Sequence, residues 1–337
     1  MKLLVTGGAG FIGSNFVHYW HEAHPNDDLV VLDVLTYAGC RESLADLGDA
    51  IRFVRADIGN TGHVVEVLDR YAIDVVVNFA AESHNSLAII DPERFFRTNV
   101  SGTVGLLEAA RTYGGLTRFH HVSTCEVYGD LDLDANEAFT ESSPYRPRTP
   151  YNASKAAADH AVRAYALTYG LPISITNCAN NYGPYQFPEK LIPLFTALVL
   201  QDQPLPLYVS KDNRREWIHV LDHARAIDLV LSKGSPGQTY HVGTGDEFSI
   251  EEIADRILAE LQKPDTLKTT VPDRPSHDRR YLLDSSKIRA ELGFAPQVQF
   301  DQGIRETIQW YRSHESWWRP LLGRAPVQES AAWHLGS

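Results

Sequence analysis

The sequence predicts an α/β fold, a doubly wound parallel sheet followed by a smaller, mixed region. Short apolar runs alternate with amphipathic stretches through the first half of the chain, which is typical of parallel strands covered by helices on both faces. After about residue 180, prolines and turns become denser while helical stretches persist. We therefore expect a sheet domain at 1–179, to which later segments could return, a second region at 180–320 over the open end of the sheet, and a loose tail at 321–337.

The individual elements follow from the same alternation. Six apolar runs are expected to form buried strands: Leu3–Thr6, Leu29–Asp33, Arg52–Ala56, Val75–Phe79, Phe119–Ser123 and Ile173–Asn177. Amphipathic stretches predict helices at Ile12–Glu22, His63–Arg70, Pro92–Tyr113, Ser154–Tyr169, Leu191–Leu200, Leu221–Ser232 and Ile250–Leu261. A later run, Thr239–Val242, could return to the first sheet as a further strand.

Composition narrows the class of protein. The 337 residues are 43% hydrophobic and 22% charged, which is ordinary for a globular protein. The formal net charge of −12 argues against nucleic-acid binding, although a few local arginines could still hold a small anionic substrate. Cys40, Cys125 and Cys178 form neither a disulfide framework nor a zinc pattern, so we expect no metal and a reduced, cytoplasmic protein. No apolar run approaches the ~20 residues that span a bilayer, and no signal-peptide layout is present.

A glycine-rich turn near the N-terminus is the most specific short signal. Gly7, Gly10 and Gly13 follow the first strand and open the first helix, with Phe11 and Ile12 between them. Glycines at this spacing allow a tight turn, close approach of backbone to a pyrophosphate, and helix–strand packing. Asp33 lies 20 residues after Gly13, at the end of the second strand, where an acid bonds ribose hydroxyls. The sequence thus predicts a Rossmann-like sheet that binds NAD rather than NADP, against the alternative of a turn without a ligand.

Two further segments are expected at the cofactor because of where their strands end. Asp57 and Ile58 follow the third strand and would lie beside the adenine. Ala80 and Ala81 follow the fourth strand and would line the nicotinamide half.

A tyrosine–lysine pair indicates the chemistry. Tyr151 and Lys155 are four residues apart at a helix start and therefore share one face. A neighbouring lysine stabilises phenolate and lowers the phenol pKa, so that Tyr151 could take a proton from a sugar hydroxyl while hydride leaves the same carbon. Thr124, just past the fifth strand, could hydrogen-bond that hydroxyl. The alternative is an ordinary surface pair.

Longer segments resemble a known family. They are Thr36–Gly39, Arg41–Leu44, Ala80–His84, Tyr151–Lys155, Asn180–Tyr185, Phe187–Pro193, Asp273–Pro275 and His277–Tyr281. In these segments the chain resembles the extended short-chain dehydrogenases/reductases, and among them the nucleotide-sugar dehydratases of the dTDP-glucose 4,6-dehydratase group. The resemblance implies NAD as cofactor, a dTDP- or UDP-hexose as substrate, and a homodimer formed through the stretches Pro92–Tyr113 and Ser154–Tyr169.

The resemblance also implies roles for individual residues. Thr124, Tyr151 and Lys155 would form the oxidising triad, and Glu126 would remove the C5 proton of the sugar. Lys190, Arg215 and Arg274 would grip the diphosphate, since arginine forks suit phosphate oxygens, although any one arginine could be a solvated surface charge. The full set of residues expected to contact the substrate is Ser83, His84, Asn180, Lys190, Leu191, Arg215, His241, Arg274 and His277.

The chain departs from the family pattern at Cys125, where the family has an aspartic acid that protonates the departing 6-hydroxyl. A thiol is a weaker acid than a carboxylic acid. Cys125 could be a substitute acid, Glu126 could carry the proton itself, or the elimination could be altered. A small buried cysteine that merely fills a gap is the structural alternative.

Two other departures accompany it. The family's Val-Asp-Arg-Ser is replaced by Asn85-Ser86-Leu87-Ala88, in a loop that borders the sugar, and His241 replaces an asparagine. The leading hypothesis is a 4,6-dehydratase that oxidises C4, eliminates water across C5–C6 and returns the hydride. The alternatives are a 4-epimerase or 5,6-dehydratase that shares the C4 oxidation, and a non-catalytic NAD-binding scaffold.

Overall fold

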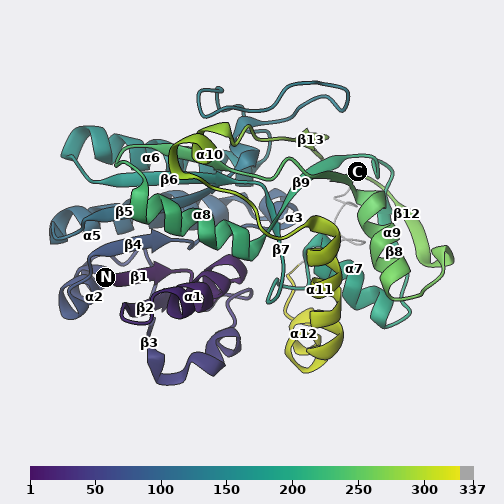
Figure 1. Ribbon diagram of the computed structural model, residues 1–337, viewed down its shortest axis with the longest axis horizontal. Helices are drawn as coiled ribbons and strands as arrows, with labels where there is room; N and C mark the ends of the chain where they lie inside the picture. The colour runs from purple at the N-terminus through teal and green to yellow at the C-terminus, as the bar shows by residue number, and fades with distance from the viewer. Residues whose placement is uncertain (327–337) are drawn as a thin grey trace.

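The computed structural model, described here for residues 1–326, is built on a seven-stranded parallel sheet (Figure 1). Its strands are β1 (Lys2–Thr6), β2 (Asp28–Asp33), β3 (Ile51–Arg55), β4 (Val75–Asn78), β5 (Arg118–Thr124), β6 (Ile173–Cys178) and β10 (Thr239–Val242). Their order is β10-β6-β5-β4-β1-β2-β3, and every neighbouring pair is parallel. The predicted Rossmann-like fold is confirmed. The order reverses beside β1, which is where such sheets bind ligands.

Helices cover both faces of this sheet. On one face, α2 (Thr61–Tyr71), α5 (Thr103–Tyr113) and α6 (Pro150–Tyr169) share an apolar cluster with the strands. On the other face lie α1 (Phe11–Ala23) and α8 (Val220–Lys233). Strands with both faces buried explain why their sequences are continuous apolar runs rather than alternating ones.

The predicted helix at 92–113 is helical throughout but not uniform. It divides into α4 (Pro92–Phe95), a π-helical segment (Phe96–Gly102) and α5. The short helix α3 (Asn85–Ile90) precedes it, and His84 caps α3 by accepting a hydrogen bond from the Leu87 N–H. Helix α3 was not predicted from the sequence, because six residues carry too little periodicity to be recognised.

The smaller region contains two short sheets and several helices, on the right in Figure 1. One sheet joins β7 (Asn180–Tyr182), β9 (Arg214–His219), β11 (Glu247–Ser249) and β13 (Arg280–Tyr281), and the other joins β8 (Leu205–Tyr208) and β12 (Lys268–Val271). Its helices are α7 (Leu191–Leu200), α9 (Ile250–Glu260), α11 (Phe300–Ser313) and α12 (Glu315–Leu322), while α10 (Ser286–Leu292) packs beside β10. Short 3₁₀ segments occur at Arg41–Ala50, Cys125–Tyr128 and Asp265–Leu267.

The start of the predicted tail packs against the rest of the chain. Leu321, near the end of α12, is buried against Cys40 and Phe187, and the Arg324 guanidinium donates to the Gly39 carbonyl at 3.1 Å. Residues 327–337 lie outside the described part of the chain. In residues 1–326, no helix combines the length and apolar character needed to cross a bilayer.

Candidate active site

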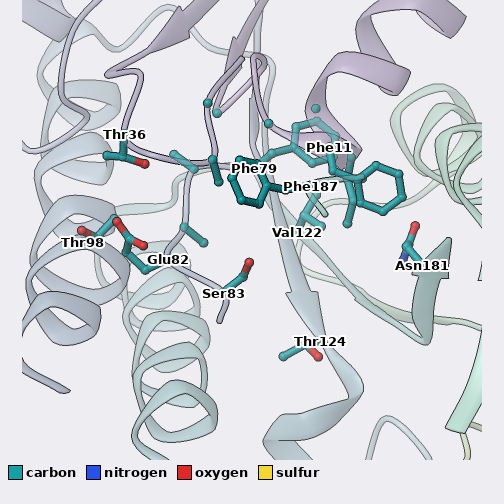
Figure 2. Close-up of a pocket in the computed structure, with 18 of the residues that line it drawn as sticks. Phe11, Thr36, Phe79, Glu82, Ser83, Thr98, Val122, Thr124, Asn181 and Phe187 are labelled. Atoms are coloured by element: carbon teal, nitrogen blue, oxygen red, sulfur yellow. The ribbon is translucent and has the colours of Figure 1, made fainter. Parts of the chain in front are cut away.

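A cavity of about 360 Å³ lies at the carboxyl ends of the parallel strands. It collects every residue that the sequence assigned to the cofactor: Gly7, Gly10, Phe11, Ile12, Gly13, Asp33, Asp57, Ile58, Ala80, Ala81, Tyr151 and Lys155. Figure 2 shows it as an elongated space, with Thr36, Glu82 and Thr98 toward one side, Asn181 toward the other, and Phe11, Phe79 and Phe187 gathered near Val122.

The glycine turn has no room for larger side chains. A Cβ on Gly7, which has φ +65°, would lie 2.6 Å from the Ala80 nitrogen, and a Cβ on Gly13 would lie 2.3 Å from the Gly7 carbonyl oxygen. Gly10 is the N-cap of α1, and no side chain caps this helix end. The first N–H groups of α1 are thus left for another acceptor, and a helix N-terminus with free N–H groups favours a phosphate. This cradle fits the pyrophosphate of a dinucleotide.

Asp33 is fixed at the edge of the cavity. Its carboxylate accepts hydrogen bonds from the Ala9 N–H at 3.0 Å and the Leu35 N–H at 2.7 Å. Burial raises the pKa of Asp33, and these two backbone donors oppose that rise. Each carboxylate oxygen has a second lone pair, so Asp33 keeps the capacity to accept the ribose hydroxyls of NAD.

Three predicted catalytic side chains reach the same cavity from two elements. Thr124 ends β5, while Tyr151 and Lys155 lie one turn apart near the start of α6. Thr149 caps α6 by accepting the Asn152 N–H, and Pro150 occupies its first turn, so the sequence itself fixes where this helix begins. All three catalytic side chains are at most 9% exposed.

Their electrostatics differ from the sequence-based expectation. The pKa of Tyr151 is well above its usual value, first because the phenol is buried and next because Glu126 is near. The Lys155 ammonium donates to the Val122 carbonyl at 2.9 Å and lies 3.4 Å from His121 Nε2. Burial also lowers the pKa of Lys155 itself.

Glu126 links this cavity to a second one. It lines both the cofactor cavity and an adjoining cavity of about 190 Å³. Its Oε2 accepts a hydrogen bond from Asn85 Nδ2 at 3.0 Å. Burial is the largest influence on Glu126 and raises its pKa, while the Asn85 bond opposes that rise. A carboxylate whose pKa is raised toward neutrality is suited to proton abstraction.

Cys125 does not line either cavity. It is 1% exposed and packs in an apolar cluster with Val127, Tyr128, Ala156 and others. Burial raises the pKa of its thiol well above the usual value, so the group stays protonated. The structure thus places Cys125 beneath the wall of the site, as a small buried side chain.

The second cavity holds most of the residues predicted to contact the substrate: Ser83, His84, Asn180, Lys190, Leu191, Arg215, Arg274 and His277. Apolar and aromatic side chains, among them Phe195, Tyr208 and Trp217, form much of its remaining wall. Cations together with aromatic faces can hold a nucleoside diphosphate, the guanidinium groups on phosphate and the rings on the base.

His241 lies away from both cavities. It is 0% exposed in β10, and its ring bonds Tyr128 Oη at 2.6 Å and the Phe139 carbonyl at 3.1 Å. The predicted substrate contact at His241 is therefore not part of the site, because the side chain turns into the core beneath the sheet edge.

Glu82 and Glu189 also line the cofactor cavity, although the sequence did not predict them as site residues. Tyr37 Oη donates to Glu189 at 2.9 Å, and the Arg94 guanidinium pairs with Glu82 at 2.9 Å. Glu82 and Glu189 both lie in segments that carried the family resemblance, but nothing in their spacing marked them as site residues. No group of His, Cys, Asp or Glu side chains within residues 1–326 is arranged to hold a metal ion.

Known proteins resemble this chain over most of its length. Residues 4–307 match the family model for GDP-mannose 4,6 dehydratase. A dTDP-glucose 4,6-dehydratase of Mycobacterium tuberculosis is 49% identical over 322 residues, covering 95% of this chain and 96% of the relative. A crystal structure of dTDP-glucose 4,6-dehydratase from Streptomyces venezuelae with NAD bound superposes with TM-score 0.91 at 48% identity, covering 95% and 100% of the two chains. A UDP-glucose 4-epimerase of Thermus thermophilus, also with NAD, gives 0.85 at 32% identity, covering 93% and 100%.

Proposed function

The chain belongs to the GDP-mannose 4,6-dehydratase family, and we propose that it is an NAD-dependent enzyme that converts dTDP-glucose to its 4-keto-6-deoxy derivative. One observation carries the proposal: Glu126 lines both cavities, beside Thr124, Tyr151 and Lys155. A hexose at this junction would have the oxidising residues on one side and a carboxylate on the other.

The residues that would hold NAD are those of the cofactor cavity. The backbone of the Gly7–Gly13 turn would take the pyrophosphate, and Asp33 the adenosine ribose. When bound, NAD supplies an acceptor, and later a donor, of hydride.

The chain's own groups handle the protons. Tyr151 would accept the C4 hydroxyl proton, Thr124 would orient that hydroxyl, and Lys155, on the same helix face, would supply positive charge for the phenolate. A ketone at C4 acidifies the C5–H bond, and Glu126 would remove that proton. Arg215, Arg274 and Lys190 would hold the diphosphate.

Mass spectrometry tests the proposal. Purified protein is incubated with NAD and either dTDP-glucose or UDP-glucose, and we expect the dTDP sugar to lose one water. Tyr151→Phe should abolish the product while NAD binding persists, because the phenol is needed for proton transfer and not for the cofactor cradle. Absence of water loss from every nucleotide hexose tried would refute the proposal.

A different reaction at the same site is the second candidate, because Cys125 lies outside the cavities. Without an acid at that position, a 5,6-dehydratase that returns hydride to C4, or a 4-epimerase, would use the same C4 oxidation. The position of the transferred hydride distinguishes both reactions from 4,6-dehydration, and the loss of one water distinguishes the 5,6-dehydratase from the epimerase.

For the assembly, we propose a homodimer that pairs α5 and α6 with the same helices of a second copy. Leu167 on α6 is 89% exposed and Tyr169 is 56% exposed, which supports an apolar contact there. Leu167→Glu should shift the protein toward monomer in light scattering. A mass equal to that of the wild type at all concentrations would argue against this interface.

A further inference from the structure

A directed chain of hydrogen bonds ends on Glu126. The Asn152 N–H donates to Thr149 Oγ1 at 3.2 Å, the Thr149 hydroxyl donates to Asn85 Oδ1 at 3.1 Å, and Asn85 Nδ2 donates to Glu126 Oε2 at 3.0 Å. Asn85 is the first residue of α3 and lines the second cavity beside Glu126. The start of α6 is thus connected to the proposed base through two side chains.

The donors and acceptors in this chain have fixed directions. Thr149 Oγ1 already accepts a backbone N–H, so its single proton is available for Asn85. Because Asn85 Oδ1 receives that proton, the amide NH₂ must be the end that faces Glu126. Glu126 Oε2 therefore acts as an acceptor in both protonation states. Within residues 1–326, Glu126 Oε1 has no hydrogen-bond partner.

The surroundings of Glu126 contain charges of both signs. Arg215 on β9 and Arg274 stabilise its carboxylate, and Asp278 destabilises it. Cys125, Tyr151 and Tyr281 also lie near Glu126, and burial together with this nearby carboxylate raises the pKa of each. Asn85 is the uncharged neighbour that donates directly to the carboxylate.

We propose that Asn85 is a positioning residue: by holding Oε2 as an acceptor, it leaves Oε1 of Glu126 to take the C5 proton and to return it to the departing 6-hydroxyl. The inference rests on the proposed function. It assigns protonation of the departing 6-hydroxyl to Glu126, because Cys125 lies outside both cavities. It makes one carboxyl group both the base and the acid of the elimination.

In this elimination, Glu126 moves one proton from C5 to the oxygen on C6. The C5–H bond breaks, an O–H bond forms at Oε1, and the electron pair moves into the C4 carbonyl to give an enolate. The enolate then re-forms the C4 carbonyl, the C5–C6 double bond forms and the C6–O bond breaks as Oε1–H protonates the leaving oxygen. One water departs and Glu126 is again a carboxylate.

Asn85→Leu tests the role, because leucine has a similar size and no donor. A hydrogen bond to a charged group typically stabilises it enough to shift a pKa by about one to two units. Losing that bond raises the pKa of Glu126, so the acid limb of the kcat–pH profile should move up by that amount. At the plateau, kcat should fall about tenfold with KM little changed, since orientation and not substrate binding is lost.

Two further variants complete the test. Thr149→Ser keeps both the helix cap and the hydroxyl donor, so we expect a wild-type profile. Asn85→Asp keeps the shape, places a carboxylate against Glu126, and should raise the acid limb at least as far as Asn85→Leu. Thermal unfolding checks that each variant is folded.

A titration that does not depend on turnover separates this inference from the proposed function. The carboxyl carbon of Glu126, labelled with ¹³C, is followed by NMR in the NAD-loaded protein, and Asn85→Leu should raise its pKa. If wild-type protein dehydrates no hexose, the proposed function fails whatever this titration gives. If wild-type protein is active but Asn85→Leu leaves both the Glu126 titration and the acid limb unchanged, the positioning role is wrong.

Discussion

Replacing Gly13 by alanine should weaken NAD binding without a change in any polar group. A Cβ at this position would lie 2.3 Å from the Gly7 carbonyl oxygen and 2.8 Å from Gly8 Cα, both backbone atoms. Relieving the contact requires the turn to move by about 1 Å, and overpacking of this kind costs about 1–3 kcal/mol. If NAD binding requires the original geometry of the turn, NAD affinity should drop by about 5- to 150-fold.

Isothermal titration of NAD into the wild type and Gly13→Ala measures the effect, with thermal unfolding recorded alongside. Gly62→Ala is the matched control, because Gly62 lies in the first turn of α2, outside the cofactor cavity, and a Cβ there meets nothing within 4 Å. It should bind NAD as the wild type does and be equally or more stable. Wild-type affinity in Gly13→Ala would refute the assignment of this turn to the pyrophosphate.

Three shorter predictions follow from the same site and its surroundings. Arg274→Gln should raise KM for the nucleotide sugar about tenfold with a smaller change in kcat, because one charge-assisted contact to phosphate is lost; an unchanged KM would remove Arg274 from the diphosphate site. Cys125→Ala should cost about 1 kcal/mol in unfolding free energy and leave dehydration near the wild-type rate, since the thiol lies outside the cavities; loss of turnover in folded protein would make Cys125 catalytic. Burial lowers the pKa of His223 to about 3, so the unfolded state binds a proton below about pH 6.5 that the folded state excludes. The free energy of unfolding should therefore fall as pH drops below that point. In denaturant titrations at several pH values, His223→Gln should make this fall shallower by about 1.4 kcal/mol per pH unit. An identical pH dependence in the variant would contradict a neutral, buried His223.

The parallel sheet and the cofactor cavity were predictable because their signals are local. A short run rich in β-branched residues, such as Val75–Phe79, favours a buried strand, and the glycine turn has a steric requirement that few other structures share. Residues that follow strand ends, such as Asp57 and Ala80, then reach the cavity through the topology alone.

The direction of individual side chains was not predictable. Cys125 and Glu126 are neighbours in the sequence, yet only Glu126 faces the cavities, because the 3₁₀ turn after β5 rotates consecutive residues to different sides. The strand that contains His241 was predicted correctly, but in this edge strand the His241 ring is directed toward Tyr128. Asn85 stood out only as a departure from a family pattern, and its bond to Glu126 depends on α3 packing against α6.

The central claim, that hydride leaves C4 and returns at C6 after water is lost, has one direct test. dTDP-glucose carrying deuterium at C4 is converted by the NAD-loaded enzyme in ordinary water, and the product is examined by NMR. The proposed function predicts a 4-keto-6-deoxy sugar with the deuterium in its C6 methyl group. Deuterium retained at C4, in an epimerised hexose or a 5,6-ene, or no turnover at all, would contradict it.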